Sequence, residues 1–131
     1  MKYLLLLILT STAIAAPAKL LDAIEKIESG GKADAVGDKG KAIGAYQIHK
    51  IMVREVNRIS GKNYTYKDRY DKKKSREMCN IFLDNSKKYI KKKKGSAPTL
   101  VELSRTWNGS YKGWNRKSTK KYGAKIRKEL K

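Results

Sequence analysis

The sequence predicts a single, mainly α-helical domain with little or no β-sheet. Apolar residues recur at helical spacing in several segments, and glycine-rich or polar stretches separate these segments. No segment shows the sustained alternation of apolar and polar residues that is typical of a half-buried strand. The chain has 131 residues, of which 40% are hydrophobic, so it allows one domain of modest size and argues against simple disorder.

Residues 1–15 have the composition of an export signal. Lys2 precedes a short apolar stretch, and small residues stand at alternate positions before the expected cut. The apolar stretch is well short of the roughly 20 residues that span a bilayer, which disfavours a retained anchor. We expect cleavage after Ala15, with a cut after Ala18 as the alternative, and export to the periplasm or the medium. Residues 16–131 then form the domain.

The first helix of this domain is predicted from Ala18 to Ser29, because Pro17 favours a helix start and Gly30-Gly31 ends the helix. Its apolar residues fall on one side, and Glu28 lies inside that apolar arc. Burial and the negative end of the helix dipole both favour the protonated carboxyl, the form that donates a proton near neutral pH. The alternative is that Glu28 turns outward and pairs with a lysine.

A polar, glycine-punctuated stretch from Lys32 to Lys41 follows, and it predicts an ordered loop or a small hairpin. Residues 42–48 are then mostly apolar and contain a single amide, Gln47. A carboxamide both donates and accepts hydrogen bonds, which suits the amide and hydroxyl groups of a sugar.

The remaining segments are predicted to be scaffold helices. A stripe at positions i, i+4, i+8 and i+11 predicts a helix that begins near Ile48 and closes at Gly61. Asp71 is expected to cap a helix from Lys72 to Tyr89, with the four lysines at 91–94 as its frayed end and connector.

Two further helices complete the predicted domain. Thr99 and Glu102 form a capping box that opens a helix carrying Trp107 on its apolar face. A last helix is expected to pack against the body through Tyr122 and two aliphatic residues after it.

Three motifs in order along the chain resemble the lysozyme-like superfamily. Residues 28–31 are Glu-Ser-Gly-Gly, residues 44–48 are Gly-Ala-Tyr-Gln-Ile, and residues 105–110 are Arg-Thr-Trp-Asn-Gly-Ser. Their order and spacing are similar to the goose-type lysozyme and soluble lytic transglycosylase branch. Small phage-type members are the most similar, through Arg-Glu-Val-Asn at 54–57 and Tyr-Thr-Tyr at 64–66. The resemblance covers about residues 18–130.

The resemblance implies a lysozyme-like fold with a substrate groove, peptidoglycan glycan strands as the substrate, and no cofactor. It implies cleavage of the β-1,4 glycosidic bond between N-acetylmuramic acid and N-acetylglucosamine, with Glu28 as general acid and base. The residues that it leads us to expect in substrate binding are Ser29, Gly44, Tyr46, Gln47, Tyr66, Trp107 and Asn108.

Protonation of the leaving oxygen by Glu28 leaves two ways to complete the reaction. Attack by water gives hydrolysis and usually needs a second carboxylate, for which Asp38 is the candidate. The alternative for Asp38 is a turn-forming aspartate next to Gly37. Attack by the muramic acid's own 6-hydroxyl gives an anhydro-sugar and needs only one residue, which serves first as acid and then as base. The family contains both outcomes.

One position departs from the family pattern. The residue before the asparagine of the third motif is typically a tyrosine whose hydroxyl points toward the catalytic glutamate, whereas this chain has Trp107. An indole offers a stacking face and one donor but no hydroxyl. Tyr46 and Tyr66 are the candidates for the missing phenol, unless the chemistry needs none. Trp107 is equally consistent with an ordinary core aromatic.

The charge of the chain indicates its class of partner. Lys and Arg number 32 against 12 Asp and Glu, a net charge of +20, and such a field attracts polyanions of any kind. Export favours anionic envelope polymers, and no regular base-reading pattern points to specific nucleic acid. Only one histidine, His49, and one cysteine are present, so no metal site is expected. We expect a monomer. The alternative function is a non-catalytic cationic protein that binds envelope polymers, membranes or nucleic acid.

Overall fold

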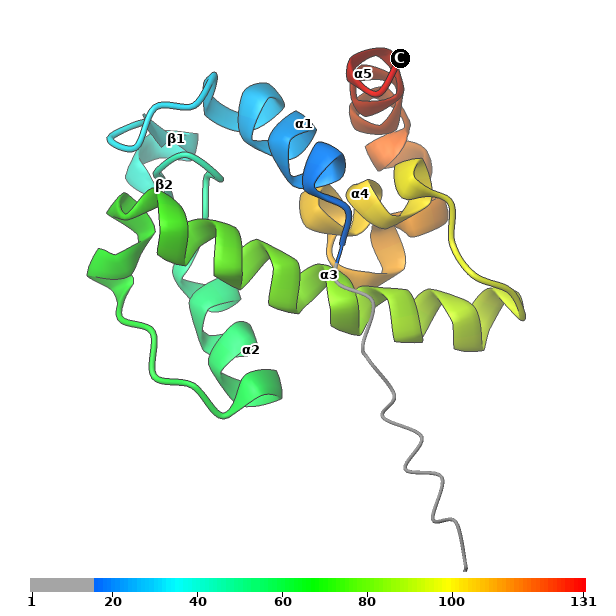
Figure 1. Ribbon diagram of the computed structural model, residues 1–131, viewed down its shortest axis with the longest axis horizontal. Helices are drawn as coiled ribbons and strands as arrows, with labels where there is room; N and C mark the ends of the chain where they lie inside the picture. The colour runs from blue at the N-terminus through cyan, green and yellow to red at the C-terminus, as the bar shows by residue number, and fades with distance from the viewer. Residues whose placement is uncertain (1–15) are drawn as a thin grey trace, which may run out of the picture.

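The computed structural model describes residues 16–131, so the predicted signal peptide at residues 1–15 lies outside the described residues. Within 16–131 the chain forms five α-helices and one small antiparallel sheet, which pairs β1 (Val36–Gly37) with β2 (Ala42–Ile43) (Figure 1). The predicted mainly α-helical class is therefore confirmed. None of the helices in this part of the chain combines the length and the apolar composition that a membrane span requires.

The longest helix, α3 (Lys72–Lys94), runs across the width of the molecule and is the element on which the others assemble (Figure 1). It contacts α1 (Ala18–Ser29), α2 (Lys50–Ser60) and α4 (Leu100–Gly109). The last helix, α5 (Lys120–Glu129), packs against α4 and α1. This arrangement brings the end of α1, the start of α2 and the end of α4 to one region of the surface.

A single hydrophobic core draws on all five helices and on the irregular segment before α2. Trp107 packs edge-on against Phe82, with the ring centroids 5.8 Å apart, and joins α4 to α3. The fully buried members with the largest side chains are Tyr46, Phe82, Leu20, Ile24, Ile48, Met78, Leu83, Ile90, Ile126, Val53 and Val56. Burial of this set fixes the helices relative to one another, and therefore fixes the side chains that they carry at the surface.

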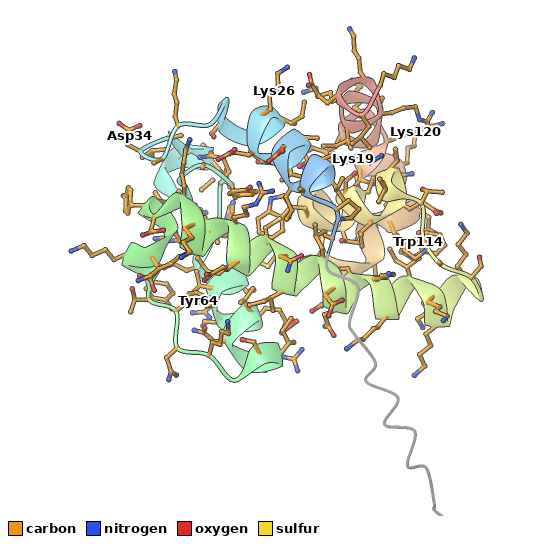
Figure 2. The ribbon with its side chains drawn as sticks, in the orientation of Figure 1. Lys19, Lys26, Asp34, Tyr64, Trp114 and Lys120 are labelled. Carbon is orange, nitrogen blue, oxygen red and sulfur yellow. The ribbon has the colours of Figure 1, made fainter. Side chains whose placement is uncertain are left out.

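The basic residues lie mainly on the outer faces of the helices. Figure 2 shows amine-tipped side chains projecting outward around the whole molecule, with Lys19, Lys26 and Lys120 among those labelled. This placement keeps the ammonium groups in water, where their mutual repulsion is screened. The net charge is therefore a property of the whole surface.

The first helix has the predicted bounds, but the long helix does not. α3 continues beyond Tyr89 through all four lysines to Lys94, and Gly95 closes it at φ 82° with its N–H donating to the Lys91 carbonyl at 2.9 Å. Lysines at the negative end of a helix dipole stabilise the last turn, and Lys94 pairs with Glu102 at 2.8 Å. The prediction of a frayed tetralysine end was therefore wrong.

The capping box predicted for α4 is confirmed. The Thr99 hydroxyl accepts from the Glu102 N–H at 3.1 Å, and the Thr99 N–H donates to the Glu102 carboxylate at 2.9 Å. The polar stretch before β2 forms the small hairpin that was one of the two predicted outcomes, with the short 3-10 turn η1 (Asp38–Gly40) at its tip. These local signals fix where α4 and the hairpin begin.

Gly44 lies directly after the hairpin, in a conformation that requires glycine. Its φ is +84°, its N–H donates to the Ala35 carbonyl at 2.8 Å, and a Cβ at this position would overlap the carbonyl oxygen of Arg69. The chain can turn from β2 into the buried segment only because that Cβ is absent.

Substituting Gly44→Ala is expected to lower the free energy of unfolding by about 3 kcal/mol or more, because left-handed strain and a backbone clash add together. Gly40→Ala is the matched control, since φ is +88° there but a Cβ would meet nothing within 4 Å. Gly40→Ala should lower the free energy of unfolding by only about 1 kcal/mol. Urea denaturation of both variants measures the difference, and equal costs would contradict the proposed clash.

Candidate active site

Glu28 lies in the last turn of α1, and the residue after it ties that turn to the buried segment at 44–48. The Ser29 hydroxyl donates to the Ala45 carbonyl at 2.7 Å and accepts the N–H groups of Gly31 and Lys32 at 3.0 and 3.1 Å. These bonds hold the end of the helix against the segment that carries Gln47. Ser29 therefore positions the glutamate and does not itself line the cavity described next.

Two adjoining cavities form a groove beside Glu28. The smaller has a volume of about 240 Å³, the larger about 720 Å³, and Gln47, His49, Trp107 and Asn108 line both. The residues that line the smaller cavity are Glu28, Asp38, Ala42, Gln47, His49, Trp107 and Asn108. Five of the nine residues predicted for the site thus come together from α1, the hairpin, the buried segment and α4.

The carboxyl of Glu28 has the electrostatics of a proton donor. Burial raises its pKa from 4.5 to about 7, and the nearby Tyr122 hydroxyl and the positive charge of Lys125 only partly oppose this effect. Near neutral pH a large fraction of Glu28 is therefore protonated. A carboxylic acid with a pKa near the working pH is suited to both halves of general acid and base catalysis.

The phenol beside Glu28 belongs to Tyr122 on α5, not to Tyr46 or Tyr66. Tyr122 is 8% exposed, and its hydroxyl has no hydrogen bond of standard geometry among residues 16–131. Burial and the charge of Glu28 raise the pKa of Tyr122 well above its usual range, so the hydroxyl keeps its proton and can donate toward the carboxyl. From the sequence, Tyr122 is predicted only as a residue that packs the last helix against the body.

Tyr46, Tyr66 and Gly44 do not line the groove. Tyr46 is fully buried, and its hydroxyl accepts from Arg76 at 3.1 Å. Tyr66 begins η2 (Tyr66–Tyr70), and its hydroxyl accepts from Arg54 at 3.5 Å. Gly44 is buried next to the Arg69 carbonyl. Tyr46 and Gly44 are therefore internal, whereas Tyr66 is exposed at the surface outside the groove.

Gln47, Trp107 and Asn108 present different groups to the groove. The Gln47 amide donates to the carbonyls of Ala35 and Gly44 at 3.3 and 3.0 Å, which fixes the carboxamide in place. Trp107 is 8% exposed and donates its N–H to the Tyr46 carbonyl at 3.1 Å, so it is both a core aromatic and part of the wall. Asn108 is exposed at the end of α4, so its amide is available to a ligand.

Asp38 lines the smaller cavity and is paired with His49, the single histidine of the chain. Its carboxylate lies 3.2 Å from Nε2 of His49, and their side chains are 59% and 41% exposed. His49 is the N-cap residue of α2, but its side chain caps no backbone N–H. The pair therefore faces the groove with its hydrogen-bonding capacity only partly used.

Backbone strain is concentrated on the groove wall. Among the described residues that are not glycine, only Asp38, Lys39, Gln47 and Ser110 have positive φ, at 46°, 55°, 52° and 62°. Three of these line one of the two cavities, and Lys39 adjoins Asp38. Each such residue costs on the order of 1–3 kcal/mol, and such strain clusters at binding and catalytic sites. The strain supports a functional groove.

A second carboxylate in the groove has the opposite electrostatics. Glu55, which lines the larger cavity, accepts hydrogen bonds from Arg58 at 2.5 and 3.1 Å and from the Tyr111 hydroxyl at 2.9 Å. These bonds lower the pKa of Glu55. Glu55 therefore stays ionised near neutral pH, so Glu28 is the acid in this groove that can donate a proton.

Comparisons with protein-family models, with curated proteins and with solved structures gave no match. In the part of the chain that the structure describes, no group of three or more His, Cys, Asp or Glu side chains could hold a metal ion. Any function assigned to the groove therefore rests on its geometry and on the sequence motifs.

The raised pKa of Glu28 makes folding stability depend on pH. The folded state binds the Glu28 proton more tightly, so this stabilisation is full below pH 4.5 and is lost as the pH rises through about 7. Relative to Glu28→Gln, the free energy of unfolding of the wild type should fall by up to about 3 kcal/mol across this pH range. Chemical denaturation at pH 4 and pH 8.5 measures the difference, and a difference independent of pH would contradict the burial of the carboxyl.

Removing the Tyr122 hydroxyl should raise the pKa of Glu28 above 7, because that hydroxyl stabilises the ionised carboxylate. Titration of the Glu28 carboxyl carbon by NMR in Tyr122→Phe measures the shift. Tyr46→Phe is the matched control and should leave this pKa unchanged, since the Tyr46 hydroxyl contacts Arg76. An unchanged or lower pKa in Tyr122→Phe would show that the phenol does not act on Glu28.

Proposed function

We propose that the protein is a peptidoglycan glycosidase that cleaves the β-1,4 bond between N-acetylmuramic acid and N-acetylglucosamine, with Glu28 as general acid and base. One observation carries the proposal: a partly buried glutamate with a pKa of about 7 lines a groove together with Asp38, Gln47 and Asn108. The order and spacing of the three sequence motifs add support. Export, which residues 1–15 predict, would deliver the enzyme to this substrate.

The reaction begins with transfer of a proton from Glu28 to the glycosidic oxygen as positive charge develops at the anomeric carbon. The alcohol is a poor leaving group without that proton, so the neutral form of Glu28 is essential. The Tyr122 hydroxyl and the charge of Lys125 stabilise the carboxylate that remains. That carboxylate is then available as a base.

The position of Asp38 favours hydrolysis over the internal-hydroxyl route. An inverting hydrolase needs a second group that activates water on the opposite face of the sugar, and Asp38 lines the same cavity as Glu28. Its pairing with His49 at 3.2 Å orients the carboxylate. Without Asp38, the ionised Glu28 could still accept the proton of the muramic acid's 6-hydroxyl and give an anhydro-sugar.

The groove has a composition suited to a polymer of acylated sugars. Its larger part is lined by Ile51, Met52 and the exposed edge of Trp107, next to the amides of Gln47 and Asn108. Apolar surface packs against the faces of sugar rings and acetyl groups, while amides bind their polar edges. The volume of the larger cavity, about 720 Å³, is in the range of small-molecule sites.

Glu28→Gln should lower the rate of peptidoglycan solubilisation by about 10²-fold or more, because an amide cannot deliver the proton. Glu25→Gln is the matched control on the same helix. Its carboxylate lies 3.7 Å from Lys72 outside the groove, and this variant should keep its activity. Release of soluble fragments from purified peptidoglycan measures both. Equal activity in the two variants, or bacteriolysis that survives Glu28→Gln, would favour the non-catalytic cationic protein.

Mass spectrometry of the soluble products distinguishes hydrolysis from attack by the 6-hydroxyl of the muramic acid. We expect products with reducing ends, and Asp38→Asn should abolish them, whereas Asp34→Asn, in the exposed turn before β1, should not. Asparagine tolerates the positive φ of Asp38, so the backbone should survive the change. Anhydro-muropeptides that persist in Asp38→Asn would assign the internal-hydroxyl route and give Asp38 no catalytic role.

A further inference from the structure

A third cavity, separate from the two that form the groove, lies at the start of α2. Its volume is about 370 Å³, and it meets the groove at His49, which lines both. The residues that line it are Gly40, Lys41, His49, Lys50, Ile51 and Arg69. Three of these are permanent cations and none is acidic, so the cavity carries a local positive potential.

Arg69 gives this cavity a buried positive charge without a counter-ion. The residue is 7% exposed, and its Nε and Nη1 donate to the carbonyls of Tyr66 and Ile48 at 2.8 and 3.0 Å. Its Nη2 has no acceptor, and no carboxylate lies within ion-pair distance, among the residues that the structure describes. Carbonyls solvate this guanidinium but do not neutralise it, so the cavity favours a ligand that brings a negative charge.

The N-terminus of α2 adjoins the cavity, because Lys50 and Ile51 line it. The His49 carbonyl accepts the N–H groups of Met52 and Val53, but those of Lys50 and Ile51 have no acceptor among residues 16–131. The helix has 11 residues, and its positive dipole end favours an anion at this point.

Two exposed lysines complete the cationic rim. Lys41 follows η1, and Lys50 begins α2 with its ammonium 5.0 Å from the centre of the Tyr66 ring. Asp38 is the acidic residue nearest in sequence to Lys41, and its carboxylate is paired with His49; Asp68, next to Arg69, is paired with Lys74. The rim therefore keeps its positive charge.

We propose that this cavity binds a phosphate group of an anionic phosphodiester polymer of the cell envelope. The donors come from separate parts of the chain: Arg69 from η2, Lys41 from the residue after η1, and Lys50 with two backbone amides from the start of α2. A tetrahedral phosphate uses such an arrangement better than a planar carboxylate, which suits one bidentate partner. The presence of the phosphate site does not rest on the glycosidase proposal, but the choice of a wall polymer does.

The first experiment titrates the folded protein with inorganic phosphate at constant ionic strength and follows backbone amides by NMR. We expect saturable shifts centred on Lys50 and Ile51 and on Nε of Arg69. Lys41→Gln/Lys50→Gln should weaken phosphate binding at least fivefold. The matched control Lys92→Gln/Lys93→Gln removes the same charge from the exposed end of α3 and should stay within twofold of wild type. Shifts spread over all lysine-bearing faces, or equal weakening in both variants, would overturn the proposal.

The second experiment identifies the source of the phosphate. Poly(glycerol phosphate) should bind more tightly than inorganic phosphate, and the Lys41→Gln/Lys50→Gln variant should lose this gain while the control keeps it. If Lys41→Gln/Lys50→Gln and the control variant differ only in their binding to vesicles of phosphatidylglycerol, the ligand is a lipid headgroup. The assignment to a wall polymer is then overturned.

Glu28→Gln separates this proposal from the proposed function. That variant should bind phosphate as tightly as wild type, because Glu28 does not line this cavity. If it also keeps full peptidoglycan activity, the glycosidase proposal fails while the phosphate site stands. If it loses activity and the wild type shows no saturable phosphate binding, the phosphate site fails alone.

Discussion

The structure depends on the hydrogen bonds that the backbone carbonyls of the buried, irregular segment at residues 44–48 accept. Unpaired carbonyls in a core are costly, and this segment lies in neither a helix nor a long strand. Ser29 donates to the Ala45 carbonyl, Trp107 to the Tyr46 carbonyl and Arg69 to the Ile48 carbonyl. These donors come from α1, α4 and η2, so one short segment sets the positions of three distant elements. Both the groove and the cationic cavity border it.

The same packing gives two glutamates opposite properties. Glu28 follows the apolar face of α1 into a site where burial outweighs its favourable neighbours, and its pKa rises to about 7. Glu55 receives two guanidinium bonds and a phenol, and its pKa falls. The groove therefore holds one neutral acid, Glu28, that can transfer a proton, and one ionised carboxylate, Glu55, that can attract a positive charge. The separation comes from hydrogen bonding and desolvation, since the two side chains are chemically identical.

Local signals in the sequence were enough for most of the fold. Pro17 and the paired glycines fixed the bounds of α1, and the Thr99 capping box fixed the start of α4. Helical periodicity also predicted that Glu28 lies within the apolar arc of α1, whereas a groove beside it was expected only from the resemblance of the motifs. Tyr122 could not be predicted in its position beside Glu28, because that contact depends on how α5 crosses α1. The pairing of His49 with Asp38 depends in the same way on the path of the hairpin.

Surface charge and buried charge have different consequences for a polyanion. Most of the lysines are exposed, so their attraction is screened over about 8 Å at physiological ionic strength and has no preferred orientation. Arg69 is buried among carbonyls with one nitrogen left unpaired, so an anion bound there must adopt a defined position. His49 lines both that cavity and the cavity of Glu28. A phosphate held at Arg69 would therefore restrict how its polymer lies along the groove, which a diffuse positive field cannot do.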